Sequence, residues 1–194
     1  MRQNEIAESR FWLASRMYAT NPNLMITFIF NPPQGCVSEA TGRISAGWDL
    51  QPDTARKKMT LFFNMLMGLV HHRGWYRNHE LERPEVIGFL ENPKTNLHYH
   101  TLAKLDDDLF SALNNWGKSQ WFGLCPGGQL DFRSVHDLEG AVRYVLADQF
   151  TPDAINEVYY YGNKGRFGNI SGGSLENWKA YRRFLGKESD GSSV

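Results

Sequence analysis

Short apolar runs alternate along the chain with longer stretches in which apolar residues recur at helical spacing. Leu24 to Phe30 is a compact apolar run bounded by Asn-Pro turns, which favours a buried strand over a helix. Asp53 can cap a helix in which Met59, Phe62 and Leu66 share one face. The same criteria predict strands over Leu24–Phe30, Glu85–Glu91, Leu97–Leu102, Ser119–Leu124, Gln129–Arg133 and Glu157–Tyr161. They predict helices over Asn4–Tyr18, Thr54–His72, Asp106–Gly117 and Ser174–Leu185, and from a capping box at Ser134 and Asp137 to about Gln149.

The order of these elements predicts one α+β domain. The strands over residues 85–91 and 97–102 are joined by a short connection and form a hairpin, whereas helices separate other strands. This pattern is typical of a central, largely antiparallel sheet flanked by helices. A length of 194 residues suits a single domain, which we place at residues 1–186 with its N-terminal helix. The polar residues 187–194 are expected to form a flexible C-terminal tail.

Composition narrows the class of protein. An apolar fraction of 41% with 22% charged residues excludes wholesale disorder, and no apolar run approaches the roughly 20 residues that span a bilayer. Glu5 and Glu8 stand where a signal peptide would be apolar, and Cys36 and Cys125 form no disulfide framework. These features predict a cytoplasmic protein with no membrane partner.

The charges balance, with 21 basic and 21 acidic residues and a formal net charge of zero at pH 7. A protein that coats nucleic acid is normally basic, so the balance counts against that class. It does not exclude an enzyme that holds a few nucleotides, because such an enzyme needs only a local basic groove and a cation.

The segment from Glu91 to His100 contains the densest group of metal-ligating side chains. Alternation along a strand directs His98 and His100 to the same sheet face, and Glu91 ends the preceding strand of the hairpin. Two imidazoles and a carboxylate suit Mn²⁺ or Mg²⁺ with coordination positions left for water and phosphate. On spacing alone, an exposed pair of histidines without a ligand explains the pattern equally well.

A second group of interest lies on the helix around Tyr144. Leu138, Val142 and Val145 fall on its apolar face, whereas Tyr144 and Asp148 fall on a different face. Tyr144 can therefore point into a cleft, or its ring can seal the edge of the helix.

The two groups together resemble the HUH endonucleases, the superfamily of rolling-circle replication initiators, relaxases and related tyrosine transposases. The resemblance rests on three stretches in the family's order, Leu24–Asn31, Glu91–His100 and Arg143–Asp148, and is strongest to single-tyrosine initiators of small replicons. It implies a ferredoxin-like or RRM-like fold.

The resemblance also implies a reaction. Glu91, His98 and His100 would hold the divalent metal, and Tyr144 would be the catalytic nucleophile that nicks single-stranded DNA through a phosphotyrosine intermediate. Such nicking and joining initiates rolling-circle replication of a plasmid, phage or mobile element. The implied partner is single-stranded or hairpin DNA at an origin. A helicase would be supplied in trans, since the chain has no helicase motif.

One position departs from the family pattern. The nucleophile motif usually reads Tyr-x-x-Lys, and here the lysine position is Ala147. Asp148 matches an acidic residue that some members carry near the metal. Either another base, such as Arg143 or Lys164, compensates, or the chain is a catalytically weakened or inactive DNA-binding protein on the same scaffold. An unrelated α+β protein with an incidental His-Tyr-His sequence is a third reading.

Further basic and aromatic residues extend the candidate site. Arg143, Lys164 and Arg166 can contact a DNA backbone, the last two from a glycine-rich segment that is equally consistent with a plain loop. Tyr159, Tyr160 and Tyr161 are alternative nucleophiles, although a strand-like run of tyrosines usually packs against neighbours.

Overall fold

The computed structural model describes residues 14–31, 52–72, 74–78, 81–91, 97–147 and 158–162. The elements are a helix over residues 14–20, β1 (Leu24–Ile29), α2 (Pro52–His71), the short helix η1 (Trp75–Arg77), β2 (Glu85–Glu91), β3 (His98–Lys104), α3 (Asp107–Leu124), β4 (Gln129–Ser134), α4 (Leu138–Ala147) and β5 (Tyr159–Tyr161). None of the helices in these ranges has the length and apolar character to cross a bilayer.

The strands form one antiparallel sheet in the order β4-β1-β3-β2-β5. The run β1-α2-β2-β3-α3-β4, with its strands ordered β4-β1-β3-β2, is the split βαβ arrangement of ferredoxin-like folds. β5 adds a fifth strand beside β2. The predicted α+β class, with a central antiparallel sheet flanked by helices, is therefore confirmed.

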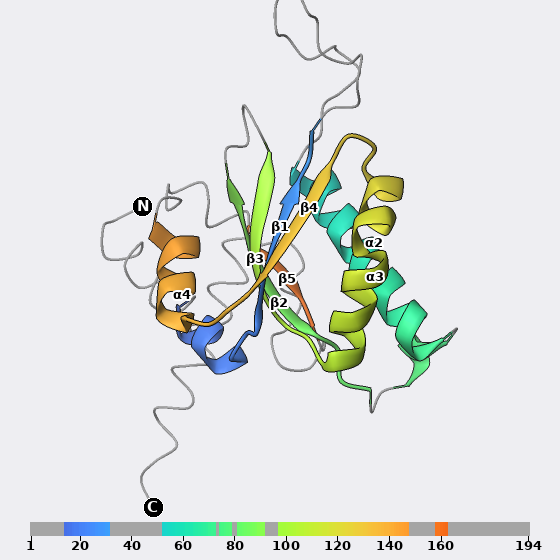
Figure 1. The fold of residues 1–194 in the computed structure, drawn as a ribbon, viewed down its shortest axis with the longest axis horizontal. Helices are drawn as coiled ribbons and strands as arrows, with labels where there is room; N and C mark the ends of the chain where they lie inside the picture. The colour runs from blue at the N-terminus through green and yellow to red at the C-terminus, as the bar shows by residue number, and fades with distance from the viewer. Residues whose placement is uncertain are drawn as a thin grey trace, which may run out of the picture.

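Different helices cover the two faces of the sheet (Figure 1). α2 and α3 pack on one face, where the ring of Phe28 lies 5.3 Å from that of Phe62 and 4.8 Å from that of Trp121. α4 and the helix over residues 14–20 pack on the other face. A smaller buried cluster lies there, formed by Met17, Ile87, Phe89, Leu102, Val142, Val145 and Val158. This second face also carries the polar side chains of the candidate site.

The prediction that a helix ends at Gly117 and a strand follows over Ser119–Leu124 is wrong, because α3 continues to Leu124. Leu113, Gly117 and Trp121 are all buried at helical spacing. A Cβ on Gly117 would lie 2.8 Å from a methyl group of Leu113 and 3.4 Å from one of Leu130, so the glycine permits close packing of α3 on β4. Trp121 fills the core.

The other predicted elements that fall in the described ranges exist, with ends that move by a few residues. Asp137 caps α4 by accepting a hydrogen bond from the Gly140 amide at 3.0 Å, whereas Ser134 ends β4. Residues 4–13 of the first predicted helix, the helix over residues 174–185 and the tail lie outside the described residues.

Gly88→Ala is expected to lower the free energy of unfolding by about 1–3 kcal/mol. An added Cβ would lie 2.6 Å from the Cγ2 of Thr101. Thr101 is fully buried and donates its hydroxyl to the Ile26 carbonyl at 3.0 Å, so it cannot rotate away without losing that bond. Urea denaturation measures the loss. Gly123→Ala is the control, because a Cβ there meets nothing within 4 Å and alanine favours a helix by up to about 1 kcal/mol. Equal midpoints for wild type and Gly88→Ala would contradict the packing argument.

Candidate metal centre and neighbouring tyrosine

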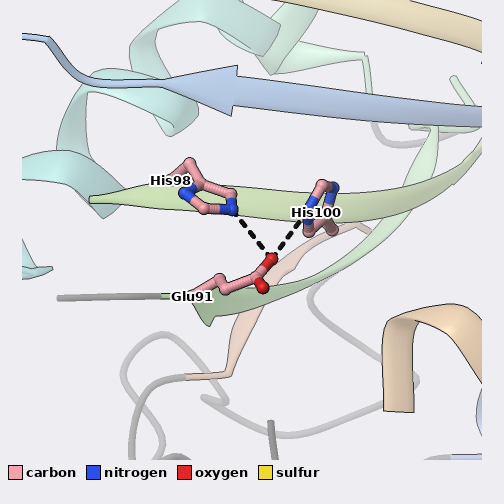
Figure 2. A group of neighbouring side chains, drawn as sticks. All are labelled: Glu91, His98 and His100. Carbon is pink, nitrogen blue, oxygen red and sulfur yellow. Dashed lines mark hydrogen bonds and ion pairs between the residues drawn. The ribbon is translucent and has the colours of Figure 1, made fainter. Parts of the chain in front are cut away.

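The side chains of Glu91, His98 and His100 converge on the second face of the sheet, as Figure 2 shows. Glu91 is the last residue of β2, and His98 is the first residue of β3. The antiparallel register pairs Glu91 with His98 and Phe89 with His100. Residues paired in this way project from the same face, and His100 follows His98 by one strand repeat. The hairpin alone therefore brings the three side chains together.

One carboxylate oxygen of Glu91 contacts the imidazoles of both His98 and His100. The Oε2 atom of Glu91 lies 2.8 Å from Nε2 of His98 and 2.8 Å from Nε2 of His100. The ligand atoms of the three residues all lie within 4.8 Å of one another. The side chains are 25%, 13% and 12% exposed for Glu91, His98 and His100, so they are shielded but still open to solvent. Two nitrogen donors and one oxygen donor can hold a divalent metal ion and leave coordination positions for other ligands.

His100 is prepared for coordination by its surroundings. Burial lowers the pKa of its imidazole, an effect that the Glu91 carboxylate opposes and His98 reinforces. A lowered pKa favours the neutral ring, and only a neutral imidazole coordinates a metal. Nδ1 of His100 lies 2.9 Å from the hydroxyl oxygen of Thr27. If Nε2 were a metal ligand, Nδ1 would carry the proton and donate a hydrogen bond to this hydroxyl, which would fix the tautomer and the ring orientation.

Among the residues that the structure describes, Thr27 also contacts this site, and it was not predicted from the sequence. It lies in the middle of β1, paired with His100 across the sheet. A signal was present, because Thr27 is the only polar residue in the apolar run LMITFIF. A lone polar residue in a half-buried strand needs a hydrogen-bond partner, and here that partner is a candidate metal ligand.

Thr27→Val is expected to weaken Mn²⁺ binding by about 10- to 100-fold, because valine keeps the shape of threonine and removes the hydroxyl that orients His100. Titration calorimetry with Mn²⁺ gives the dissociation constant. Thr27→Ser retains a hydroxyl and should bind within a few-fold of wild type. Equal affinity for the valine variant and the wild type would show that the hydroxyl does not position the ring.

Tyr144 lies beside the metal-ligand cluster. Val142 and Val145 on α4 are buried against the sheet, and their anchoring directs Tyr144 away from the core. The ring of Tyr144 is 5.3 Å from that of His100, at an interplanar angle of 76°. The residue remains 55% exposed, so a substrate can reach it. α4 therefore places a phenol next to one of the three ligand side chains.

The remaining predicted site residues have different surroundings. Arg143 is exposed on α4 and forms an ion pair with Glu139. Ala147 is the last residue of α4. Asp148, Lys164 and Arg166 lie outside the described residues.

The tyrosines of β5 divide between the two faces of the sheet. Tyr159 and Tyr161 are buried on the face covered by α2, where the Tyr161 hydroxyl donates to Asn64 at 2.9 Å. Burial raises the pKa of both phenols, which disfavours their ionised, nucleophilic form. Tyr160 pairs with Ile87 and packs against the cluster beneath α4, on the same face as Glu91, His98 and His100.

The sequence and the fold have little similarity to known proteins. No family model matches the sequence, and no curated protein matches it. Among solved structures, the chain has a weak likeness to the N-terminal origin-recognition/nickase domain of non-structural protein 1 from an emerging human bocavirus. That comparison has a TM-score of 0.27 and 15% sequence identity, and covers 84% of this chain and 75% of the bocavirus chain.

Proposed function

We propose that this protein is a metal-dependent endonuclease that nicks single-stranded DNA through a phosphotyrosine intermediate and can rejoin the strand. The observation that supports this most directly is the position of Tyr144, whose ring lies 5.3 Å from that of His100. The proposed nucleophile and a cluster of two histidines and a glutamate thus lie over one sheet face, on elements that are distant in sequence.

Different residues have different roles in the proposed reaction. Mn²⁺ or Mg²⁺ bound by Glu91, His98 and His100 would polarise the scissile phosphate and stabilise the charge that develops on it. Tyr144 attacks the phosphorus in line with the departing 3′ oxygen. Its phenolic oxygen forms the new bond to phosphorus and releases its proton to solvent, while the 3′ oxygen leaves and takes up a proton. The products are a 5′-phosphotyrosine and a free 3′-hydroxyl, and the retained phosphoester bond allows rejoining.

The biological setting we propose is initiation of rolling-circle replication of a plasmid, phage or mobile element. The substrate is then single-stranded or hairpin DNA at an origin, with a helicase supplied by another protein. Asp148 is the proposed assisting carboxylate, and Arg143, Lys164 and Arg166 are proposed contacts to the DNA backbone.

A DNA-binding protein without cleavage activity is the second candidate function. Ala147 favours it, because a lysine at that position would help to neutralise the phosphate during attack. The three metal-ligand side chains and the exposed tyrosine favour the enzyme, since a binding module needs neither.

The test is capture of a covalent adduct. The protein is incubated with a pool of single strands of about 40 random nucleotides, with Mn²⁺ or with EDTA, and denatured in detergent. We expect detergent-resistant protein–DNA complexes only with Mn²⁺, and sequencing of the captured strands should give one shared cleavage site. DNA binding that is insensitive to EDTA and yields no adduct would instead support the binding module.

A further inference from the structure

A cavity of about 410 Å³ lies between α2 and β5, and none of the candidate metal ligands lines it. Thr60 and Asn64 line it from α2, and Tyr159 lines it from β5. Its volume falls within the range of roughly 300–1,000 Å³ that is typical of small-molecule sites. The proposed nicking reaction makes no use of this cavity.

Hydrogen bonds within the wall leave donors for a ligand. The Tyr161 hydroxyl donates to Oδ1 of Asn64 at 2.9 Å, so the Asn64 NH₂ group is the part of the amide left for a ligand. Thr60 donates its hydroxyl to the Tyr159 oxygen at 3.4 Å, which leaves the Tyr159 hydrogen for another acceptor. The raised pKa of Tyr159 keeps this hydrogen in place. The cavity wall therefore offers donors to an acceptor-rich ligand.

The charges at the cavity favour an anion with a single charge. Arg56, Lys57 and Asp53 are the charged residues among those that line it. Arg56 forms an ion pair with Asp53, and the three side chains together carry one net positive charge, from Lys57. A phosphodiester carries one negative charge and accepts hydrogen bonds through its oxygens, so it matches both the charge and the donors.

We propose that this cavity binds one phosphodiester-linked nucleotide of an unpaired DNA strand, as a contact separate from the metal centre. The identity of the polymer rests on the proposed function, but the binding itself requires neither metal nor Tyr144. A strand held in this way would be anchored at the β5 edge of the sheet.

Binding of a fluorescein-labelled oligothymidylate of about a dozen nucleotides tests the proposal, measured by anisotropy with wild-type protein in EDTA. Lys57→Gln should weaken binding about tenfold, as expected for loss of a charged hydrogen bond. It should also reduce the slope of log affinity against log salt by about 0.7, the value for one phosphate contact on a single strand. Lys57 is exposed, so its replacement should not affect folding.

Asn64→Asp gives a second, independent variant. Aspartate can still accept from the Tyr161 hydroxyl, but it replaces the donor by a negative charge, and binding should fall by at least about tenfold. Lys118→Gln, the same charge change on the exposed surface of α3, should leave affinity and slope unchanged.

Competition distinguishes a strand from free phosphate. A thymidine dinucleotide should displace the oligothymidylate at least as well as thymidine monophosphate or inorganic phosphate. Wild-type affinity and slope in the Lys57→Gln protein would overturn the proposal, and so would competition by inorganic phosphate alone. Adduct formation with Mn²⁺ is scored separately, so that loss of nicking with normal cavity binding contradicts the proposed function and not this site.

Discussion

Tyr144→Phe is expected to abolish the covalent protein–DNA adduct while DNA binding stays within a few-fold of wild type. The substitution removes only the hydroxyl that forms the bond to phosphorus, and the ring still packs against His100. Removal of a nucleophile from a covalent mechanism typically costs roughly 10⁴-fold or more in rate. The adduct should therefore fall below detection in a gel assay with Mn²⁺.

Phenylalanine substitutions in β5 are the matched controls. Tyr159→Phe and Tyr161→Phe change buried phenols on the opposite face of the sheet, so the adduct should still form at saturating DNA, although the proposed strand contact at the cavity is weakened. Tyr160→Phe is the more demanding control, because Tyr160 shares the face of the metal ligands. An adduct that persists in Tyr144→Phe and disappears in Tyr160→Phe would place the nucleophile on β5.

Local sequence was sufficient to predict that Glu91, His98 and His100 converge on one face of the sheet. Glu91, His98 and His100 come from two strands joined by a short connection, so strand alternation and hairpin register determine their relative positions. The exposed side of α4 followed from its apolar spacing, because burial of Val142 and Val145 leaves Tyr144 outside the core.

Features that depend on contacts between elements far apart in sequence could not be predicted from local sequence. Thr27 contacts His100 only because β1 pairs with β3, which are far apart in sequence. The continuation of α3 through Gly117 depends on its packing against Leu130 in β4. Glycine is a poor helix former, so local propensity favours a break that close packing overrides. The closeness of Tyr144 to His100 depends likewise on where α4 docks on the sheet.

His98→Ala and His100→Ala are each expected to abolish measurable Mn²⁺ binding, with dissociation constants raised by more than about 100-fold. Each substitution removes one of three ligands, and this exceeds the roughly 10- to 100-fold cost of disturbing a supporting contact such as that of Thr27. The Nε2 atoms of both histidines lie 2.8 Å from the same Glu91 oxygen. Each ring therefore occupies its own position beside the carboxylate, and loss of one leaves a ligand position that the other cannot fill.

The His98→Ala and His100→Ala variants should also fail to form the covalent protein–DNA adduct, because they no longer bind Mn²⁺. His136→Ala, an exposed histidine in the connection before α4, should leave both unchanged. Binding of oligothymidylate in EDTA should survive in all these variants, because the proposed strand contact at Lys57 is separate from the cluster. If the His98→Ala protein binds Mn²⁺ as tightly as wild type, the cluster is not the metal site. The His98–Glu91 contact is then a hydrogen-bonded polar pair at the end of a hairpin. The nuclease proposal then lacks the metal ion that would polarise the phosphate.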